Sequence, residues 1–431
     1  MPVDDSRLSG FYKLSVEERR NIVARLSNLS EDQIEALSST GELSESAADH
    51  MIENVIGTMS LPVGIATNFI IDEKAYLIPF CVEESSIVAA ASNMAKRCLK
   101  HGGFKTSSDD SIMIAQMQIL DLENTAVAAE AIKTAKYELI SACNSIESTM
   151  IRLGGGCKDI EVREIDTMQG KMLILHLLVD TKDAMGANAV NSMAERITPN
   201  VEQITSGRVH LRILSNLASH RLAKVEARFT PEEMADDGTR ESGIKVIKAI
   251  LEAHSFAMAD PYRAATHNKG IMNAISAIAL ACGQDWRAIE AGCHSWASVE
   301  TGTYTSMTRW EKDEDWNLIG RIETPMAVGI VGGASKVHPA ARANLAILGV
   351  ESAKELGGIM AAAGLAQNLG AMRALATVGI QAGHMKLHAK NMAVSAGAIG
   401  DEIEIVANIV NSSKQQVTQK LVEETLKSIR K

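Results

Sequence analysis

The chain has 431 residues, of which 46% are hydrophobic, 22% charged and 3% aromatic, and its formal net charge is −10. This length is too great for one compact core, so we expect two or three domains in a helix-rich globular protein. The dispersed Lys and Arg argue against a nucleic-acid surface, and no apolar run reaches the roughly 18 residues that span a bilayer, which argues against a membrane protein.

Two further features of the chain indicate a cytoplasmic protein. The N-terminus M-P-V-D-D-S has no signal-peptide pattern. Six cysteines are scattered without a C-x-x-C pair, a distribution that indicates neither a zinc site nor a disulfide scaffold. We therefore expect free thiols in or near the core.

The first hundred residues predict a short helical lead, a strand region and a helix. Capping-box spacing at Ser30 marks a helix start. Residues 63–82 are expected to form strands with a turn between them, and Ser85-Ser86 to cap a helix that ends near Gly102.

Glu83 and Glu84 lie between these strands and the helix. Carboxylates at such a position commonly match the helix dipole as surface charge. The apolar surroundings favour a second interpretation, in which one acid points into a cleft, has a raised pKa and donates a proton.

Residues 112–215 read as β-α-β-β-α-β, the split unit of a ferredoxin-like domain. The predicted elements are a strand at 112–120, a long amphipathic helix at 124–153, strands at 159–165 and 172–179, a helix at 183–196 and a strand at 209–214. We therefore expect an α+β fold in which a small domain is inserted in a larger, helix-rich one.

The segment 183–188 (D-A-M-G-A-N) follows a strand of this insert and opens a helix. Its glycine lets the backbone approach a pyrophosphate, and the first helical amides supply donors. No G-x-G-x-x-G follows a strand, so a Rossmann domain is not supported. Glu147, two turns before the glycines at 154–156, either accepts from a ribose hydroxyl or is a solvated charge.

The segment 260–273 (D-P-Y-R-A-A-T-H-N-K-G-I-M-N) is bounded by apolar runs. We expect Lys269 to be buried there, and a buried amine keeps its charge only beside an anion. The nearest downstream acid is Asp285. Such a pair is either a preorganised positive charge for an oxygen that becomes anionic during a reaction, or an ordinary buried ion pair.

Three later features carry further candidates. Gln367 is the polar side chain of its helical segment that is expected to look into a cleft. The glycine-rich loop 329–339 suits phosphate binding or a structural turn. His384 and His388 have the i, i+4 spacing of half a metal site, but no third ligand accompanies them, so we expect no metal and favour a general-acid histidine on a mobile tail.

A set of motifs carries a resemblance to a known family. They are E-N-V-I-G at 53–57, V-E-E-S-S-I-V-A-A-A-S at 82–92, D-A-M-G-A-N at 183–188, L-R-I-L-S-N-L at 211–217, the whole of 260–273, G-G-A-S-K-V-H-P at 332–339, A-Q-N-L-G-A-M-R-A-L-A-T at 366–377 and G-H-M at 383–385. With them the chain resembles, over nearly its whole length, the soluble bacterial and archaeal class (class II) of the 3-hydroxy-3-methylglutaryl-coenzyme A (HMG-CoA) reductase family.

The resemblance implies reduction of HMG-CoA to mevalonate and free CoA with two dinucleotides used in turn, or the reverse oxidation. It implies that Lys269 stabilises the oxyanion and that Asp285 orients Lys269 and holds it charged. Glu84 would donate a proton near the carbonyl, and His384 would protonate the departing CoA thiolate.

The resemblance also implies binding residues. The substrate-binding set is Ser86, Arg263, Thr266, Asn273, Gln367 and Leu375, with Arg263 suited to the free carboxylate of the substrate. The cofactor-binding set is Glu147, Asp183, Met185, Gly186, Ala187, Asn188 and Asn216. No metal is implied.

The implied assembly is a homodimer, or a higher assembly of dimers, whose active sites are shared between subunits. The implied domains are a discontinuous large substrate, CoA and dimerisation domain (1–111 and 216–379), a small dinucleotide-binding domain (112–215) and a C-terminal flap (380–431).

Glu147 stands where an NADH-using relative has an aspartate on the adenosine ribose. A carboxylate bonds the 2′-hydroxyl and repels a 2′-phosphate, so NADH is favoured. Arg152 and Lys158 lie nearby and keep NADPH as the alternative. Tyr12 stands where one relative has a basic residue for the CoA phosphate, which puts that contact in doubt.

Two rival functions are weighed against this one. A CoA-acylating aldehyde dehydrogenase requires a nucleophilic cysteine, and none of the six lies among the polar segments. A non-catalytic CoA- or nucleotide-binding protein predicts that Lys269→Ala leaves function intact. The physiological direction of the reductase reaction does not follow from the residues.

Overall fold

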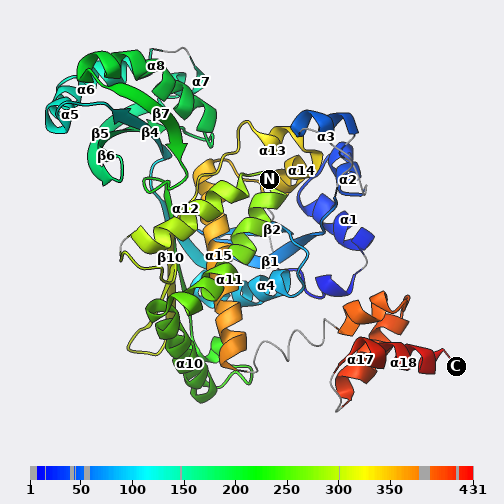
Figure 1. The fold of residues 1–431 in the computed structure, drawn as a ribbon. Helices are drawn as coiled ribbons and strands as arrows, with labels where there is room; N and C mark the ends of the chain where they lie inside the picture. The colour runs from blue at the N-terminus through cyan, green and yellow to red at the C-terminus, as the bar shows by residue number, and fades with distance from the viewer. Residues whose placement is uncertain are drawn as a thin grey trace.

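The computed structural model describes residues 7–14, 16–38, 43, 45–52, 59–145, 148–299, 301–377, 389–413 and 417–430. Two sheets, each with its own large hydrophobic core, form most of this structure, and the C-terminal helices pack on a smaller core of their own (Figure 1). Among these residues, no helix combines the length and the apolar character that crossing a bilayer requires.

The larger sheet has six strands. They are β1 (Val63–Ile71), β2 (Lys74–Cys81), β3 (Phe104–Ser108), β8 (Leu222–Phe229), β9 (Thr308–Lys312) and β10 (Leu318–Pro325), in the order β2-β1-β3-β8-β10-β9. β1 pairs with β3 in parallel, and the other neighbours are antiparallel. The predicted strands within 63–82 are confirmed. In β8 buried apolar residues alternate with the charged Lys224, Glu226 and Arg228, so one face of the sheet is polar.

Helix α15 (Ala353–Ala376) runs through the core of this part and is buried along most of its length. Its Ala- and Gly-rich composition makes it apolar on all sides, which is the composition of a central buried helix. A Cβ at Gly364 would lie 2.9 Å from Ile275 of α11 (Pro261–Ala281), and one at Gly370 would lie 3.2 Å from Ala90 of α4 (Ile87–Arg97). The glycines therefore allow three helices to meet closely.

The other helices cover the two faces and the ends of the large part. They are α1 (Val16–Leu26), α2 (Glu31–Ser38), α3 (Glu45–Met51), α9 (Pro231–Met234), α10 (Arg240–Ala259), α12 (Trp286–Val299), α13 (Ala334–Val337) and α14 (Pro339–Leu348). The C-terminal helices α17 (Glu402–Ser412) and α18 (Gln419–Ile429) pack on the separate smaller core. The capping box at Ser30 is confirmed, since its amide donates to Gln33 Oε1 at 2.8 Å.

The smaller sheet lies at one end of the molecule in Figure 1 and carries its own helices. Its elements are β4 (Ile112–Leu120), α5 (Thr125–Thr134), α6 (Lys136–Cys143), α7 (Thr149–Arg152), β5 (Gly156–Thr167), β6 (Gly170–Asp180), α8 (Ala187–Thr205) and β7 (Arg208–Ser215). The strand order β5-β6-β4-β7, antiparallel throughout, is that of a ferredoxin-like sheet. The predicted α+β fold with this insert is confirmed.

The single long helix predicted at 124–153 is wrong. The chain breaks between α5 and α6 at Ala135, and α6 ends before Asn144. The side chain of Asn144 bonds both the amide and the carbonyl of Cys157, at 2.8 and 2.9 Å. Side-chain bonds of this kind compete with helix continuation, so Asn144 ties the chain to β5 instead.

Candidate active site

Helix α11 presents four of the predicted residues along one side. Arg263, Thr266, Lys269 and Asn273 follow one another at helical spacing, which keeps their side chains on one face. Asp260 begins the helix, and its carboxylate accepts from the amide of Arg263 at 3.0 Å. The face therefore starts directly after a well-formed cap.

The ammonium group of Lys269 lies 3.0 Å from Oε2 of Glu84, which precedes α4. The Lys269 side chain is 61% exposed and that of Glu84 38%. The expectation that Lys269 is buried is wrong for a single chain. The helix turns Lys269 to solvent and packs the next residue, Gly270, toward Ala371 of α15.

The expected contact between Lys269 and Asp285 is not formed within the chain. At about 1.5 Å of rise per residue, Lys269 lies roughly 18 Å from Ala281, where α11 ends, and Asp285 comes after that end. There the Asp285 carboxylate accepts from the amide of Ala288 at 3.1 Å and pairs with Arg287 at 3.3 Å. Within one chain Asp285 therefore caps α12.

The guanidinium group of Arg263 has no acidic partner among the described residues. Partial burial lowers the pKa of this group, and no carboxylate of the described residues offsets the effect. A guanidinium without an acidic partner is suited to bidentate binding of a carboxylate. Arg263 lies six residues before Lys269 on the same face of α11. Two cations therefore lie on one side of this helix.

Helix α15 carries two of the candidate substrate-binding residues, Gln367 and Leu375, and their surroundings differ. Gln367 is only 5% exposed, and its Oε1 has no hydrogen-bond partner among the described residues. Leu375 is exposed near the end of the helix. A buried amide oxygen without a donor is costly, so Gln367 is the group that a bound ligand with a donor would satisfy.

Ser86 begins α4, but not as a side-chain cap. Its φ is +76°, in the left-handed region, and its hydroxyl makes no capping bond. The predicted serine cap is therefore wrong at this residue. A non-glycine residue in this conformation costs free energy and tends to occur at functional sites, which agrees with the place of Ser86 two residues after Glu84.

A buried polar network behind Lys269 was not predicted. His267 Nε2 lies 2.8 Å from Ser306 Oγ, 3.0 Å from Thr308 Oγ1 and 3.1 Å from Asn368 Nδ2. Burial lowers the pKa of His267 to about 3, so the ring is neutral near pH 7. The network joins α11 to α15 through His267 and Asn368. His267 lies two residues before Lys269, and Asn368 directly follows Gln367, the substrate candidate on α15. The available signal was the pair His267-Asn268 in the polar stretch between the two apolar runs.

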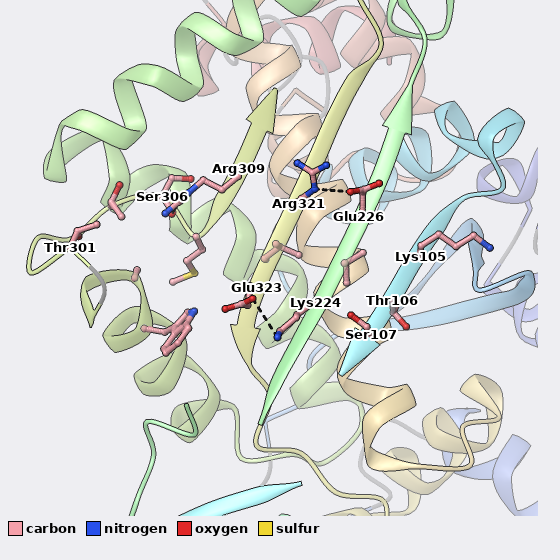
Figure 2. Close-up of a pocket in the computed structure, with 16 residues that line it drawn as sticks. Lys105, Thr106, Ser107, Lys224, Glu226, Thr301, Ser306, Arg309, Arg321 and Glu323 are labelled. Atoms are coloured by element: carbon pink, nitrogen blue, oxygen red, sulfur yellow. Dashed lines mark hydrogen bonds and ion pairs between the residues drawn. The ribbon is translucent and has the colours of Figure 1, made fainter. Parts of the chain in front are cut away.

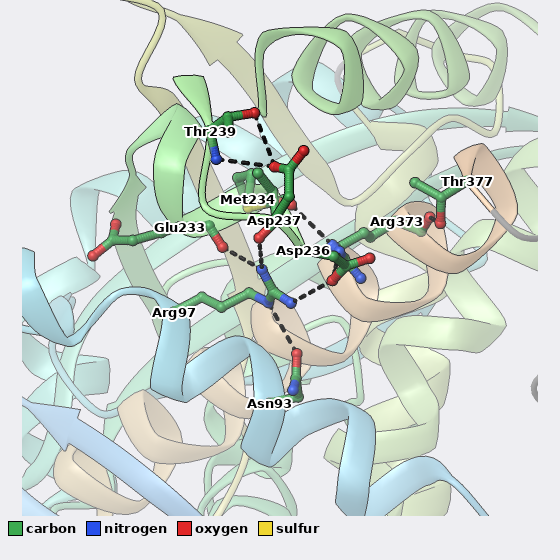
Figure 3. Close-up of polar contacts among 10 residues, drawn as sticks. Asn93, Arg97, Glu233, Met234, Asp236, Asp237, Thr239, Arg373 and Thr377 are labelled. Carbon is green, nitrogen blue, oxygen red and sulfur yellow. Dashed lines mark hydrogen bonds and ion pairs between the residues drawn. The ribbon is translucent and has the colours of Figure 1, made fainter. Parts of the chain in front are cut away.

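Arg97 and Arg373 join the far end of α4 to α15 (Figure 3). Their Nη2 atoms lie 3.2 and 2.5 Å from the same Oδ1 of Asp236, and Arg373 Nε also donates to the carbonyl of Met234 at 3.2 Å. Both guanidinium groups are mostly buried. The cluster therefore orients the two helices that carry candidate substrate contacts.

The predicted dinucleotide loop joins β6 to α8. Gly186 is the N-cap of α8 with φ +88° and no side-chain cap, and a Cβ there would lie 2.3 Å from Thr181 Cγ2. The first amides of α8, from Ala187 and Asn188 on, have no intrahelical acceptor, and Asn188 is exposed beside them. A left-handed glycine before free amides fits a phosphate group.

Other members of the cofactor set have different surroundings. Asp183 Oδ1 accepts from the amide of Ala353 at 2.9 Å, so this carboxylate caps α15, and the Asp183 carbonyl accepts from Ile330. Met185 packs against the core of the small sheet, and Asn216 is exposed just after β7. Glu147 and His384 lie outside the described residues, as do the motif at 53–57 and His388.

A cavity of about 600 Å³ lies elsewhere, on the polar face of the large sheet (Figure 2). Its rim carries paired charges of β8 and β10, among them Lys224 with Glu323 at 3.7 Å and Glu226 with Arg321 at 2.6 Å. None of the predicted site residues that the structure describes lines it. It is therefore separate from the surface around Lys269.

Comparison with known proteins gives matches that cover most of the chain. The profile of the family described as hydroxymethylglutaryl-coenzyme A reductase matches residues 15–389. The 3-hydroxy-3-methylglutaryl-coenzyme A reductase of Archaeoglobus fulgidus is 54% identical over 405 residues, which cover 94% of this chain and 91% of that protein.

Solved structures of the Streptococcus pneumoniae enzyme are similar over the whole length. One is 37% identical, covers 98% of this chain and 99% of that chain, and has a TM-score of 0.83. Another, a class II enzyme bound to NADPH in open conformations, is 36% identical with a TM-score of 0.81, and covers 97% of this chain and 100% of that one.

Proposed function

This chain belongs to the hydroxymethylglutaryl-coenzyme A reductase family, and we propose that it interconverts HMG-CoA with mevalonate and CoA, using two nicotinamide dinucleotides in turn. The observation that carries the proposal is the Lys269–Glu84 pair on the face of α11. It sets a cation and a carboxyl group side by side, the two kinds of group that can stabilise an oxyanion and transfer a proton when a carbonyl is reduced to an alcohol. The same groups serve the oxidation of mevalonate.

In this proposal Lys269 stabilises negative charge on the carbonyl oxygen as it develops, and Glu84 supplies the proton. Arg263, with no acidic partner among the described residues, binds the free carboxylate of the substrate. Thr266, Asn273, Gln367, Ser86 and Leu375 complete the substrate site. The orphaned Gln367 Oε1 supports this role, because a substrate hydroxyl can donate to it.

Asp285 reaches Lys269 in our proposal only from a second copy of the chain. Within one chain the two residues are separated by the C-terminal part of α11, and the Lys269 side chain is largely exposed. A partner that brings its Asp285 over this face would bury the lysine and hold its charge. The proposed assembly is therefore a homodimer, or dimers of dimers, with shared sites, and His384 is proposed to protonate the CoA thiolate.

The dinucleotide is proposed to bind at the β6–α8 loop. The bare N-terminus of α8 and the left-handed Gly186 fit its phosphates, while Ala187, Asn188, Met185 and the neighbouring residues Asp183 and Asn216 shape the site. The dinucleotide supplies reducing equivalents when bound. NADH is favoured because Glu147 would repel a 2′-phosphate, although the pneumococcal relative is bound to NADPH.

The domain assignment is also a proposal: 112–215 binds the dinucleotide, 1–111 with 216–379 binds substrate and CoA and forms the dimer, and 380–431 is a flap. It is supported by separate cores for the small sheet, the large sheet and the C-terminal helices. A cytoplasmic location is proposed because all six cysteines are free thiols, which suit a reducing compartment.

The cysteines weigh against a CoA-acylating aldehyde dehydrogenase. That chemistry needs a thiolate in the site, and the half-buried Cys81 is the one nearest in sequence to Glu84. Burial raises the pKa of Cys81, and the charge of Glu83 raises it further. The thiol is therefore held protonated and is a poor nucleophile.

The assay follows the absorbance of the reduced dinucleotide. Each of NADH and NADPH is offered with HMG-CoA, and each oxidised form with mevalonate plus CoA. We expect consumption of reduced dinucleotide with release of a CoA thiol, and faster turnover with NADH. No HMG-CoA-dependent change with either dinucleotide would rule out the proposed activity, and equal rates with both would rule out the role of Glu147.

A further inference from the structure

Arg221 lies where the chain returns from the small sheet to the large one, one residue before β8. Its residue is only 5% exposed. No carboxylate among the described residues comes within ion-pair distance of its guanidinium, although Asp180 and Asp183 act on it from farther away. Burial lowers the pKa of Arg221 to about 10, so it stays cationic near pH 7. A buried cation without a paired anion is costly and must be compensated by well-placed hydrogen bonds.

Those bonds join three segments of the chain. Arg221 Nη1 donates to Thr181 Oγ1 at 3.0 Å and to the Ala184 carbonyl at 3.1 Å, both in the β6–α8 loop. Its Nη2 donates to the Val328 carbonyl at 2.5 Å, in the segment after β10. Thr181 Oγ1 in turn lies 2.9 Å from the Ala184 carbonyl, which closes the loop on itself. One planar guanidinium thus spans the small and the large part of the molecule.

Backbone contacts hold the outer side of the same loop. The carbonyl of Asp183 accepts from the amide of Ile330 at 2.9 Å, and its carboxylate caps α15. A Cβ at Gly329 would lie 2.5 Å from the amide nitrogen of Met185, so the two segments are in close contact. The loop ahead of α8 is therefore attached to the large part at several points, with Arg221 beneath it.

We propose that Arg221 is a positioning residue for the dinucleotide. This role rests on the proposed function. The hydrogen bonds of Arg221 hold residues 181–186 in place, so that the free amides of α8 point toward the phosphates of the dinucleotide. Preorganisation of donors matters because small displacements of binding groups cost large factors in affinity and rate. The attachment of the loop to α15 also fixes the distance between the dinucleotide and substrate sites.

The arginine side chain is suited to this task in a way that lysine is not. A lysine keeps the positive charge, but its single ammonium group cannot reproduce the planar fork that reaches two carbonyls and a hydroxyl. A methionine fills similar volume and removes every bond. The series Arg, Lys, Met at position 221 therefore separates hydrogen-bond geometry from charge and from packing.

The test measures the dissociation constants of NADH and NADPH for the full-length protein by fluorescence titration, without turnover. We expect Arg221→Met to weaken binding of the preferred dinucleotide by about tenfold or more, and Arg221→Lys to fall between it and the wild type. The KM for the dinucleotide should rise by a similar factor, while the KM for HMG-CoA stays within about twofold of the wild-type value. Arg208→Met is the control, because Arg208 is an exposed arginine at the start of β7 in the small sheet, 2.8 Å from Asp121.

Thr181→Val gives a second test if the Arg221 variants do not fold. It removes the hydroxyl that accepts from Arg221 at nearly constant volume, and we expect it to weaken dinucleotide binding with HMG-CoA affinity unchanged. Wild-type affinity in both Arg221→Met and Thr181→Val would overturn the role of Arg221. A wild-type protein that binds neither dinucleotide would instead overturn the proposed function.

Discussion

Lys269 Nζ and Glu84 Oε2 lie 3.0 Å apart, although the two residues are separated by 185 positions in the chain. The pair forms because α15 brings α11 and α4 together at closely packed glycines. It is partly exposed, so as an isolated surface ion pair it adds little stability. Its significance is chemical: it combines a fixed cation with a potential acid on a face that also carries Arg263.

Lys269→Met is expected to lower kcat by roughly two orders of magnitude, or about 3 kcal/mol of transition-state stabilisation, with a smaller change in the KM for HMG-CoA. The variant loses the charge that meets the developing oxyanion. Steady-state kinetics measure the effect, and Lys245→Met, at an exposed lysine of α10, is the control. Wild-type kcat in Lys269→Met would exclude the proposed role of Lys269 in stabilising the oxyanion.

Mixing two inactive variants tests the shared site. If Asp285 acts on Lys269 of the other copy, a mixed dimer of Lys269→Met and Asp285→Asn chains contains one intact site and one doubly altered site. Because one of its two sites is intact, the mixed dimer is expected to have about half of the wild-type activity per dimer. Activity is measured after co-expression and purification through two different tags. If the mixture stays as inactive as its parents, the two residues do not meet across subunits.

Cys81→Ala is expected to keep kcat within about threefold of the wild-type value, because the thiol is held protonated by burial and lies outside the proposed chemistry. The same assay and a thiol-alkylation time course check this. A loss of activity beyond a hundredfold in a folded Cys81→Ala protein would favour a thioester intermediate and hence the aldehyde dehydrogenase chemistry.

The buried His267 predicts acid sensitivity. Burial, and then the charge of Arg263, lower its pKa to about 3, against about 6.5 in the unfolded chain. The unfolded state therefore binds more protons below pH 6.5, and the free energy of unfolding falls as the pH drops from there toward 3. His267→Gln should therefore reduce the dependence of the unfolding free energy on pH, by up to about 1.4 kcal/mol per pH unit between pH 6 and 4.5.

Urea unfolding at fixed protein concentration measures this slope. His210→Gln, at an exposed position of β7, controls for the loss of a histidine. An unchanged pH dependence in His267→Gln would mean that His267 does not take up a proton when the protein unfolds in this pH range.

Gly102 and Gly103 form a matched pair for a stability test. Both have positive φ, +81° and +77°, but a Cβ at Gly102 meets nothing within 4 Å, whereas one at Gly103 would lie 2.1 Å from the carbonyl oxygen of Ile70. Gly102→Ala should cost about 1 kcal/mol of unfolding free energy from strain alone. Gly103→Ala should cost several kcal/mol more, because β1 and β3 must separate. Equal midpoints in thermal unfolding would contradict the steric argument.

The sequence by itself determined the class of fold and the candidate residues. Apolar runs predicted β1 and β2 of the large sheet and the four strands of the small sheet, and the order of elements in 112–215 predicted the ferredoxin-like insert, since such patterns are local. The apolar runs on both sides of 260–273 made the polar residues of that segment, Lys269 among them, candidates. The motifs shared with a known family supplied the roles.

Only the tertiary structure decided which of these groups meet. Within one chain Lys269 pairs with Glu84 and not with Asp285, because helix packing brings α4 alongside α11 while the length of α11 carries Asp285 away. The break at Asn144 and the burial of Arg221 likewise depend on partners distant in sequence. Hydrogen-bond partners far along the chain follow from the packing of whole elements, and a local pattern contains no information about that packing.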